Sequence, residues 1–231
     1  KMIITVKTSL GSYDIVLERG ALLKANEHLS LDRKVLVVTD SGVPNEYSQS
    51  ILEKAREGFL VTIPEGEGSK NMDNLQNILK ALVSNGFTRT DCVVAVGGGV
   101  VGDMAGFAAS IFMRGIDFYN IPTTVLSQVD SSIGGKTAID FMGIKNIVGA
   151  FYPPKKVVID ADTLKTLPKR QISNGLCEAL KMAATFDEKL FEIFEEGRAE
   201  SEIDRILEGS LRIKKAVVEE DEREGSVRKV L

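Results

Sequence analysis

Continuous apolar stretches that alternate with amphipathic ones constrain the fold of this chain more than any other feature. Residues 33–40 (RKVLVVTD) form a continuous β-branched apolar run followed by a turn, which is typical of a strand buried on both faces of a parallel sheet. Residues 59–70 predict another strand with a glycine-rich loop, and residues 91–99 (DCVVAVGGG) predict a strand that leads into glycines. The segment 72–86 shows apolar residues at helical spacing and ends in Gly86. Strands that alternate with helices predict an α/β fold.

The two ends of the chain predict different architectures. Alternating residues near the N-terminus predict a short hairpin of 2–7 and 13–18, and further patterns predict helices over 45–57 and 100–115 and a strand over 117–124. From about residue 160 onward the pattern is helical. We therefore predict a Rossmann-like parallel-sheet domain over residues 1–160, followed by the beginning of an all-helical domain over 161–231.

The charge balance argues against several classes of partner. The chain has 29 Lys and Arg residues against 33 Asp and Glu residues, a net charge of −4, so no global basic field attracts nucleic acid or anionic lipid. Its apolar runs are much shorter than the roughly 20 residues that a membrane-spanning helix needs, and the N-terminus shows no signal-peptide pattern. We expect a cytoplasmic protein that binds neither nucleic acid nor membranes.

Cysteine and histidine are scarce. Cys92 and Cys177 lie in apolar contexts that favour small core side chains over a disulfide. The single histidine, His28, lies in a polar stretch typical of a helix end or a surface loop. This composition supports neither a histidine-rich metal site nor a Ser-His-Asp triad.

A glycine-rich junction is the first candidate for a ligand site. Residues 97–102 (GGGVVG) satisfy G-x-G-x-x-G between a predicted strand and a predicted helix, which favours a nucleotide site over a plain tight turn. The junction follows several elements instead of the first strand, so the fold is Rossmann-like without the standard topology. Asp40, at the end of a predicted strand, is either a ribose-binding carboxylate or a helix N-cap. A P-loop at 131–137 is disfavoured because Asp130 occupies the position of the required glycine.

Charged and polar residues also interrupt segments that otherwise look buried or glycine-rich; these are Arg114, Asp130, Lys136, Lys145, Asn146, Glu178 and Lys181. Cations around one pocket suit an anionic small molecule, although each alone could be a surface residue. Glu178 and Lys181 lie three residues apart in an apolar helical segment and so share one face. Unpaired burial is costly, and we therefore expect a metal, a substrate or a mutual ion pair there.

Four contiguous motifs point to a known family. They are GGGVVGDMAGFAAS at 97–110, PTTVLSQVDSSIGGKTAID at 122–140, GIKNIVGAFYPP at 143–154 and LKTLPKRQISNGLCEALK at 164–181. In this order they resemble the 3-dehydroquinate synthases, and the similarity extends over essentially the whole chain. The resemblance implies a homodimeric lyase of the shikimate pathway to chorismate and the aromatic amino acids. It implies an NAD- and Zn²⁺- or Co²⁺-dependent cyclisation of 3-deoxy-D-arabino-heptulosonate 7-phosphate (DAHP) to 3-dehydroquinate, with release of phosphate.

The resemblance also implies roles for individual residues. The NAD-contacting positions of the family match Asp40, Glu67, Lys70, Gly98, Gly99, Asp103, Thr123, Thr124, Lys145 and Thr166. The substrate positions match Asp130, Lys136, Asn146, Lys181, Lys214 and Arg228. Arg114 matches a catalytic arginine that the family presents across its dimer interface, and Glu178 matches the carboxylate ligand of the catalytic metal.

One departure from the family concerns the metal. The sequence stops at Leu231, before the NFGHT-like motif and the later histidine that complete the family's metal site, so Glu178 lacks two ligands and we expect a fragment of a longer protein. Cys177 is a disfavoured ligand because it points to another helix face than Glu178. The alternatives are a 2-deoxy-scyllo-inosose synthase-like cyclase, a non-catalytic NAD-binding module and, more weakly, an alcohol or glycerol dehydrogenase. Lys214 and Arg228 favour DAHP because this pair suits a carboxylate.

Overall fold

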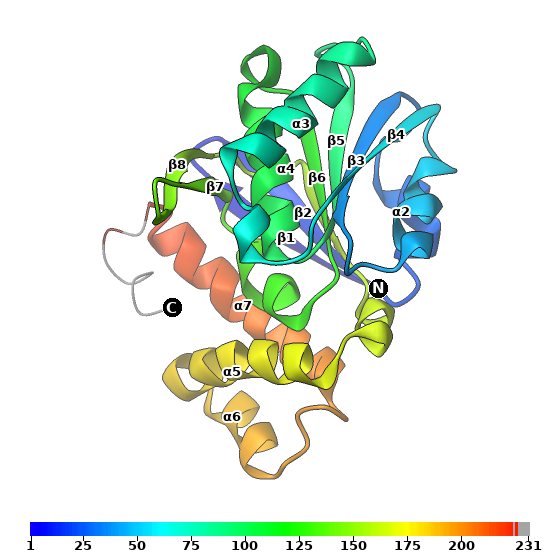
Figure 1. Ribbon diagram of the computed structural model, residues 1–231. Helices are drawn as coiled ribbons and strands as arrows, with labels where there is room; N and C mark the ends of the chain where they lie inside the picture. The colour runs from blue at the N-terminus through cyan, green and yellow to red at the C-terminus, as the bar shows by residue number, and fades with distance from the viewer. Residues whose placement is uncertain (224, 226–231) are drawn as a thin grey trace.

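A seven-stranded sheet forms the centre of the computed structural model, which describes residues 1–223 and 225 (Figure 1). The strand order is β1-β2-β9-β6-β5-β3-β4, with β1 and β2 antiparallel and the other neighbours parallel. The strands are β1 Met2–Thr8, β2 Gly11–Leu17, β3 Lys34–Asp40, β4 Glu57–Ile63, β5 Cys92–Gly97, β6 Asp117–Pro122 and β9 Lys156–Ile159. The predicted α/β fold, the N-terminal hairpin and the strands from 33, 59, 91 and 117 are confirmed.

Helices cover both faces of this sheet. They are α1 Ala25–His28, α2 Asn45–Leu52, α3 Met72–Ser84 and α4 Gly99–Ile111. Three further helices, α5 Lys169–Phe186, α6 Glu188–Glu195 and α7 Ile203–Glu220, form a helical cluster. The side chains of α3 and α4 pack against one face, and those of α1 and α2 against the other. Both faces of β3 and β5 are therefore buried, which explains their unbroken apolar runs.

Two predicted helices are shorter than expected. The segment predicted as helix over 45–57 ends at Leu52, because the chain turns and enters β4 at Glu57. The helix predicted over 100–115 ends at Ile111 and gives way to the 3₁₀ turn η3 Phe112–Arg114. Met113 and Arg114 there have φ values of 49° and 67°, which an α-helix does not accommodate.

A second hairpin was not predicted. Strands β7 Lys136–Phe141 and β8 Ile144–Phe151 form a separate two-stranded sheet that packs beside α4. Met142 and Gly143 join them, both with positive φ (51° and 79°), the geometry of a tight hairpin turn. Strand β9 was also missed; it inserts between β2 and β6 and so completes the sheet.

The C-terminal helices form their own apolar core and also contact the sheet. Helices α5 and α6 lie at one end of the molecule, and α7 runs from there toward the β7–β8 hairpin (Figure 1). Leu190, Ile193 and Ile206 of α6 and α7 pack together. Helix α7 runs back to β1, whose Lys7 amide donates to Glu219 Oε1 at 2.8 Å. The division into domains at residue 160 stays a prediction. In residues 1–223 and 225, no helix has the length and apolar character needed to cross a membrane.

One expectation about a single residue was wrong. Cys177 is exposed on α5, whereas Cys92 is buried as expected and its burial raises the pKa of the thiol to about 12. His28 ends α1, as its sequence context predicts, but its side chain is buried, with Nε2 3.2 Å from Glu18 Oε2. Burial lowers the pKa of His28.

Candidate functional site

The strand order reverses direction between β3 and β5. Strand β4 lies on one side of β3, whereas β5, β6 and β9 follow on the other side. In open α/β sheets, ligands bind outside the carboxyl ends of the strands at such a switch point. The ends of β3 and β5 carry Asp40 and the glycine loop from Gly97, so the topology brings these two sequence signals to one location.

Asp40 does not cap a helix. Its Oδ1 accepts from the Gly42 amide at 2.8 Å, and α2 begins after Pro44 without a side-chain cap. Burial raises the pKa of Asp40, with smaller opposing effects from the backbone amides of Gly42 and Val43. The N-cap interpretation is therefore wrong. The carboxylate stands at the carboxyl end of β3, which is where a ribose would lie at such a switch point.

The glycine loop leaves room for backbone-to-ligand contact at the start of α4. Gly98 is the N-cap of α4 and provides no side-chain cap. A β-carbon would lie 3.3 Å from Thr124 Cγ2 at Gly98 and 2.9 Å from Ser131 Oγ at Gly99. Ser131 Oγ is itself buried without a hydrogen-bond partner among the described residues. Free helix amides, a cradle that a side chain would fill and an orphan hydroxyl fit the phosphates of a dinucleotide.

The predicted threonines lie around this loop. The Thr123 amide donates to the Gly97 carbonyl oxygen at 2.9 Å, which joins the ends of β5 and β6. The Thr124 hydroxyl lies 2.8 Å from Ser127 Oγ. Thr166, at the end of the 3₁₀ turn η5 Ala161–Thr166, lies 2.8 Å from the hydroxyl of Tyr47 on α2. Thr123 and Thr124 thus adjoin the glycine loop, and Thr166 adjoins α2.

A buried lysine connects this loop with the second hairpin. Lys70 is 4% exposed, and its Nζ lies 2.5 Å from Asp103 Oδ2 on α4 and 2.5 Å from Asn146 Oδ1 on β8. Burial raises the pKa of Asp103 to about 6, against the opposing effect of Lys70. Glu67 and Lys145 form an exposed pair at 3.8 Å beside this cluster.

A cavity of about 530 Å³ adjoins the cluster. Its polar lining consists mainly of Asp103, Asp130, Lys136, Asn146 and Lys214. Lys214, buried on α7, places Nζ 2.5 Å from Asp130 Oδ1, so α7 meets the π-helical turn η4 Ser127–Ser131 at this point. One residue predicted for NAD and four predicted for substrate therefore face the same cavity.

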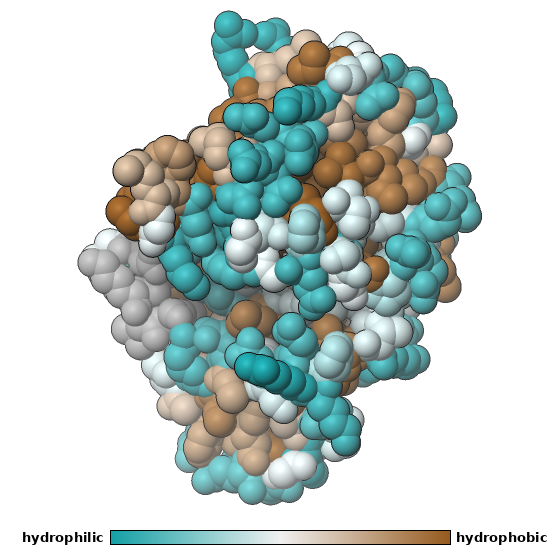
Figure 2. Space-filling view, in the orientation of Figure 1, coloured by the Kyte–Doolittle hydropathy of each residue, from teal (hydrophilic) through white to brown (hydrophobic). Residues whose placement is uncertain are grey.

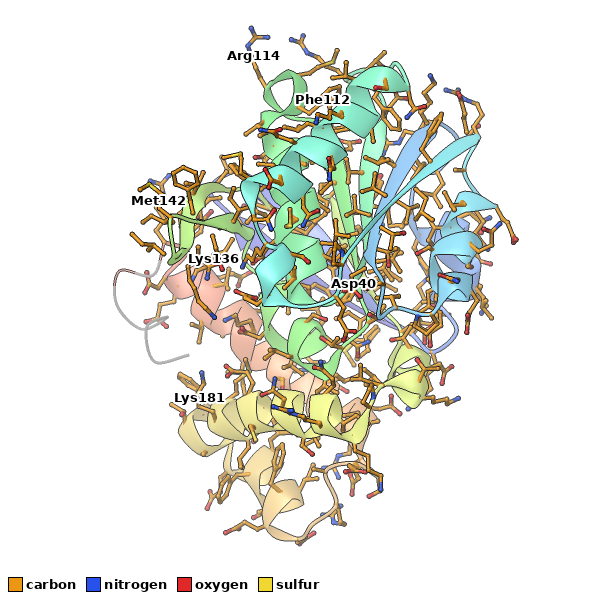
Figure 3. All side chains as sticks on the ribbon, viewed as in Figure 1. Asp40, Phe112, Arg114, Lys136, Met142 and Lys181 are labelled. Atoms are coloured by element: carbon orange, nitrogen blue, oxygen red, sulfur yellow. The ribbon has the colours of Figure 1, made fainter. Side chains whose placement is uncertain are left out.

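Glu178 and Lys181 lie on α5, across a gap from Lys136 (Figure 3). Their side chains form an ion pair, Lys181 Nζ to Glu178 Oε1 at 2.8 Å, which is one of the three outcomes that their spacing predicts. In the described part of the chain, no group of three His, Cys, Asp or Glu side chains is placed to hold a metal, so these residues alone do not fit one.

Arg114 stands apart from the cavity. Arg114 is exposed, and Figure 3 shows it at the end of the molecule remote from Lys136 and Lys181. It does not join the other predicted residues within one chain. Arg228 lies outside the described residues.

Sequence reasoning did not single out Ser131 or Asp140. Ser131 lines the cavity, and Asp140 Oδ1 accepts from the Asn146 amide at 2.8 Å. Both residues lie within the motif at 122–140, which was a signal for their neighbourhood. Their individual contacts depend on the β7–β8 hairpin, which was not predicted.

Comparison with known proteins identifies related sequences over most of the chain. Residues 60–174 match the family model of the 3-dehydroquinate synthase N-terminal region, and residues 175–231 match that of the C-terminal region. The 3-dehydroquinate synthase of Alkaliphilus metalliredigens (strain QYMF) is 42% identical over 228 residues, which cover 95% of this chain and 64% of that protein. The chain thus spans less than two thirds of the length of this relative.

Solved structures show the same architecture. The structure of ValA, a 2-epi-5-epi-valiolone synthase from Streptomyces hygroscopicus subsp. jinggangensis 5008 with NAD⁺ and Zn²⁺ bound, superposes with a TM-score of 0.85 at 29% identity, covering 94% of this chain and 64% of that one. A 2-deoxy-scyllo-inosose synthase complexed with carbaglucose-6-phosphate, NAD⁺ and Co²⁺ gives 0.83 at 24% identity, covering 99% and 65%. The second likeness shows the fold alone.

Proposed function

On the premise that this chain belongs to the 3-dehydroquinate synthase family, we propose that the full-length protein is a 3-dehydroquinate synthase. It cyclises DAHP to 3-dehydroquinate and releases phosphate. The observation that carries this proposal is the cavity in which Asp103, bound to Lys70, faces Asp130, Lys136, Asn146 and Lys214. This arrangement supports a dinucleotide site beside a small-molecule site that offers lysine side chains to an anion.

The cavity suits a substrate with two anionic ends. Lys136 and Lys214 line it, and Lys181 lies across the gap on α5. A phosphate and a carboxylate each gain from a lysine held in place by the fold. Lys214 is already positioned by Asp130, so a bound anion would exchange one partner of this amine for another without moving α7. Asn146 offers both a donor and an acceptor to the substrate hydroxyls.

We propose that NAD lies along the switch point. Asp40 would hold the ribose, and the α4 amides with Gly98, Gly99, Thr123 and Thr124 would hold the phosphates. Lys70, Asp103, Glu67, Lys145 and Thr166 would complete the site. When bound, NAD supplies a transient oxidation of a ring hydroxyl, which acidifies the neighbouring carbon. The side chains of the chain itself orient the two ligands and balance their charge.

We propose a divalent metal, zinc or cobalt, with Glu178 as one ligand. The Zn²⁺ named for the ValA structure supports this assignment. The remaining ligands would have to come from outside the described residues, since the described part of the chain presents no metal-binding cluster. Until such ligands are supplied, Lys181 neutralises the Glu178 carboxylate.

A second candidate function follows from this incomplete metal site. The 231-residue chain by itself would be an NAD-binding module without catalysis. Calorimetry on this chain distinguishes the two candidates. NAD binding without stoichiometric zinc binding supports the module, whereas tight zinc binding contradicts it.

The test of the enzyme is phosphate release from DAHP by the full-length protein with NAD and a divalent metal present. We expect turnover that stops when either cofactor is withheld. Glucose 6-phosphate, which lacks the carboxylate, is the matched substrate for the 2-deoxy-scyllo-inosose synthase alternative, and we expect no turnover of it. Absence of DAHP turnover with both cofactors present would sink the proposal.

We also propose that the protein is a cytoplasmic homodimer in which Arg114 reaches the partner's site. The exposure of Arg114 and its distance from the cavity of its own chain support this assignment. Sedimentation measures the oligomeric state. Mixing an Arg114→Ala chain with an inactive Lys136→Ala chain is expected to restore part of the activity, because one site of the mixed dimer is intact.

A further inference from the structure

Asp140 lies where the β7–β8 ladder is irregular. Ile139 pairs with Val148 and Phe141 pairs with Ile144, so the register shifts at the residue between them. Such irregularities re-aim side chains and are frequent beside active sites. Here the Asp140 carboxylate points to β8 and meets the backbone of Asn146, with Oδ1 2.8 Å from that amide nitrogen.

Asp140 belongs to a closed ring of contacts. Its own amide donates to the Lys70 carbonyl oxygen at 2.8 Å, and its carboxylate accepts from the Asn146 amide. Lys70 Nζ closes the ring on Asn146 Oδ1 at 2.5 Å. Lys70 and the two strands of the β7–β8 hairpin, which lie far from it in sequence, are thereby fixed relative to one another at the edge of the cavity.

Asn146 needs this support because of its backbone. Its φ is 54°, a left-handed conformation that is unfavourable for a non-glycine residue. Asparagine tolerates the conformation better than most residues, but the side chain then points wherever the strained backbone directs it. The hydrogen bond from the Asn146 amide to Asp140 stabilises this one conformation and so fixes the direction of the side-chain amide.

We propose that Asp140 is a positioning residue that holds Asn146, and with it Lys70, in the geometry that the cavity requires. The inference rests on the proposed function for its catalytic consequence. In this role Asp140 acts through an acceptor oxygen at a defined place, whereas its charge acts separately by contributing to the raised pKa of Asp103. This distinction separates two conservative variants, because Asp140→Asn keeps the acceptor without the charge and Asp140→Glu keeps the charge but displaces the acceptor.

The kinetic test uses the full-length protein with NAD, metal and DAHP. We expect Asp140→Ala and Asp140→Glu to lower kcat/KM about tenfold, and Asp140→Asn to stay within about threefold of the parent, as expected when catalytic geometry is perturbed and then rescued. Asp140→Ala should add little in an Asn146→Ala background, because the side chain that Asp140 positions is then absent. Asp73→Ala, an exposed carboxylate on α3, is the control and should not change kcat/KM.

A second measurement does not depend on turnover. Hydrogen exchange of the Asn146 amide, followed by NMR, should be slow in the parent and in Asp140→Asn and at least about tenfold faster in Asp140→Ala. Equal exchange in all three would overturn the inference, as would an active Asp140→Glu beside an inactive Asp140→Asn. If the parent protein fails to turn over DAHP, the proposed function falls, and the exchange rates still decide whether Asp140 holds Asn146.

Discussion

At the scale of single residues, Lys70 carries more of the site than its place in the sequence suggests. It follows a short 3₁₀ turn, η2 Glu67–Ser69, and is nevertheless buried between α4 and the second hairpin. One amine contacts a residue assigned to NAD, Asp103, and a residue assigned to substrate, Asn146. A substitution of Lys70 should therefore affect the binding of both NAD and substrate.

The ionisation of Asp103 tests this arrangement. Burial raises its pKa from an ordinary 3.8 to about 6, and Lys70 opposes the shift. We expect Lys70→Met to raise the pKa of Asp103 further, because the opposing charge and hydrogen bond are lost. Glu67→Gln should lower it, since Glu67 contributes to the upward shift. Carboxyl-carbon NMR across a pH titration measures both, and shifts of the same sign would contradict this account.

The same shift has a consequence for stability. The folded chain binds the Asp103 proton more tightly than the unfolded chain, so this group stabilises the fold at low pH. Its contribution is lost as the pH rises from about 4 to about 6. Comparing the pH dependence of the free energy of unfolding with that of Asp103→Asn should show this loss in the parent only.

Residue-scale predictions from sequence succeeded where spacing along one element decides the contact. The separation of Glu178 and Lys181 predicted that they share one helix face, and their ion pair is one of the three outcomes expected there. They failed where burial depends on which elements pack together. His28 is covered because β2 brings Glu18 beside it, and Cys177 lies on the exposed side of α5. The polarity of the neighbouring residues in the sequence indicates neither the burial of His28 nor the exposure of Cys177.

At the scale of elements, small residues set how closely α5 approaches the sheet-bearing part. A β-carbon at Gly175 would meet Val125 and lie 2.5 Å from the Leu126 backbone nitrogen. Backbone cannot move aside as a long side chain can. This glycine therefore determines the position of the helix that carries Glu178 and Lys181.

We expect Gly175→Ala to destabilise the protein by about 1–3 kcal/mol through overpacking, despite the better helix propensity of alanine. Gly68→Ala is the matched control, because no atom lies within 4 Å of the added carbon and the backbone there is ordinary. Denaturant unfolding measures both variants. Equal stability of the two would show that α5 shifts without cost.

The β7–β8 hairpin shows why some elements escaped prediction. Its strands lie in a glycine-containing stretch, and its turn is Met142–Gly143 instead of the usual Asn-Gly. The hairpin is stabilised by packing beside α4, where a β-carbon at Gly106 would lie 2.6 Å from Thr137 Cγ2. Tertiary contact, not turn chemistry, accounts for its formation.

A substitution in the turn between β7 and β8 should therefore increase the stability of the protein. Met142 is 85% exposed at a φ of 51°, so it loses little packing on replacement and its backbone is strained; Figure 2 shows the hydrophobic surface of this hairpin tip. We expect Met142→Asn to stabilise the chain by about 1 kcal/mol, or roughly 2–4 °C in Tm for a chain of this length. Met142→Val, which disfavours positive φ, should have the opposite effect. Calorimetry checks both, and a lower Tm for the asparagine variant would argue against a strained turn.

At the scale of the whole molecule, the cavity exists because two structural parts meet. Asp103 and Asn146 come from the sheet-bearing part, whereas Lys214 comes from α7 in the helical cluster. The order of strands and glycines predicted the dinucleotide half of the site. The joining of the halves depends on Asp130 reaching Lys214 across the interface, a contact between residues separated by more than eighty positions that no local pattern specifies.

The two halves should therefore be separable by mutation. Lys214→Met removes a cation from the substrate side and leaves Asp130 without its partner, so we expect the KM for DAHP to rise about tenfold or more. The Kd for NAD should stay within about twofold, because Lys214 does not adjoin the glycine loop. Lys70→Met should instead weaken NAD binding as well, since Lys70 holds Asp103.

Lys215→Met, on the neighbouring position of α7 and paired with Glu219, is the control that changes neither constant. Calorimetric NAD titrations and DAHP kinetics on the full-length protein measure these values. Equal losses of both ligands in Lys214→Met would mean that the helical cluster holds the dinucleotide site in place, and that the two ligands bind to one cooperative unit.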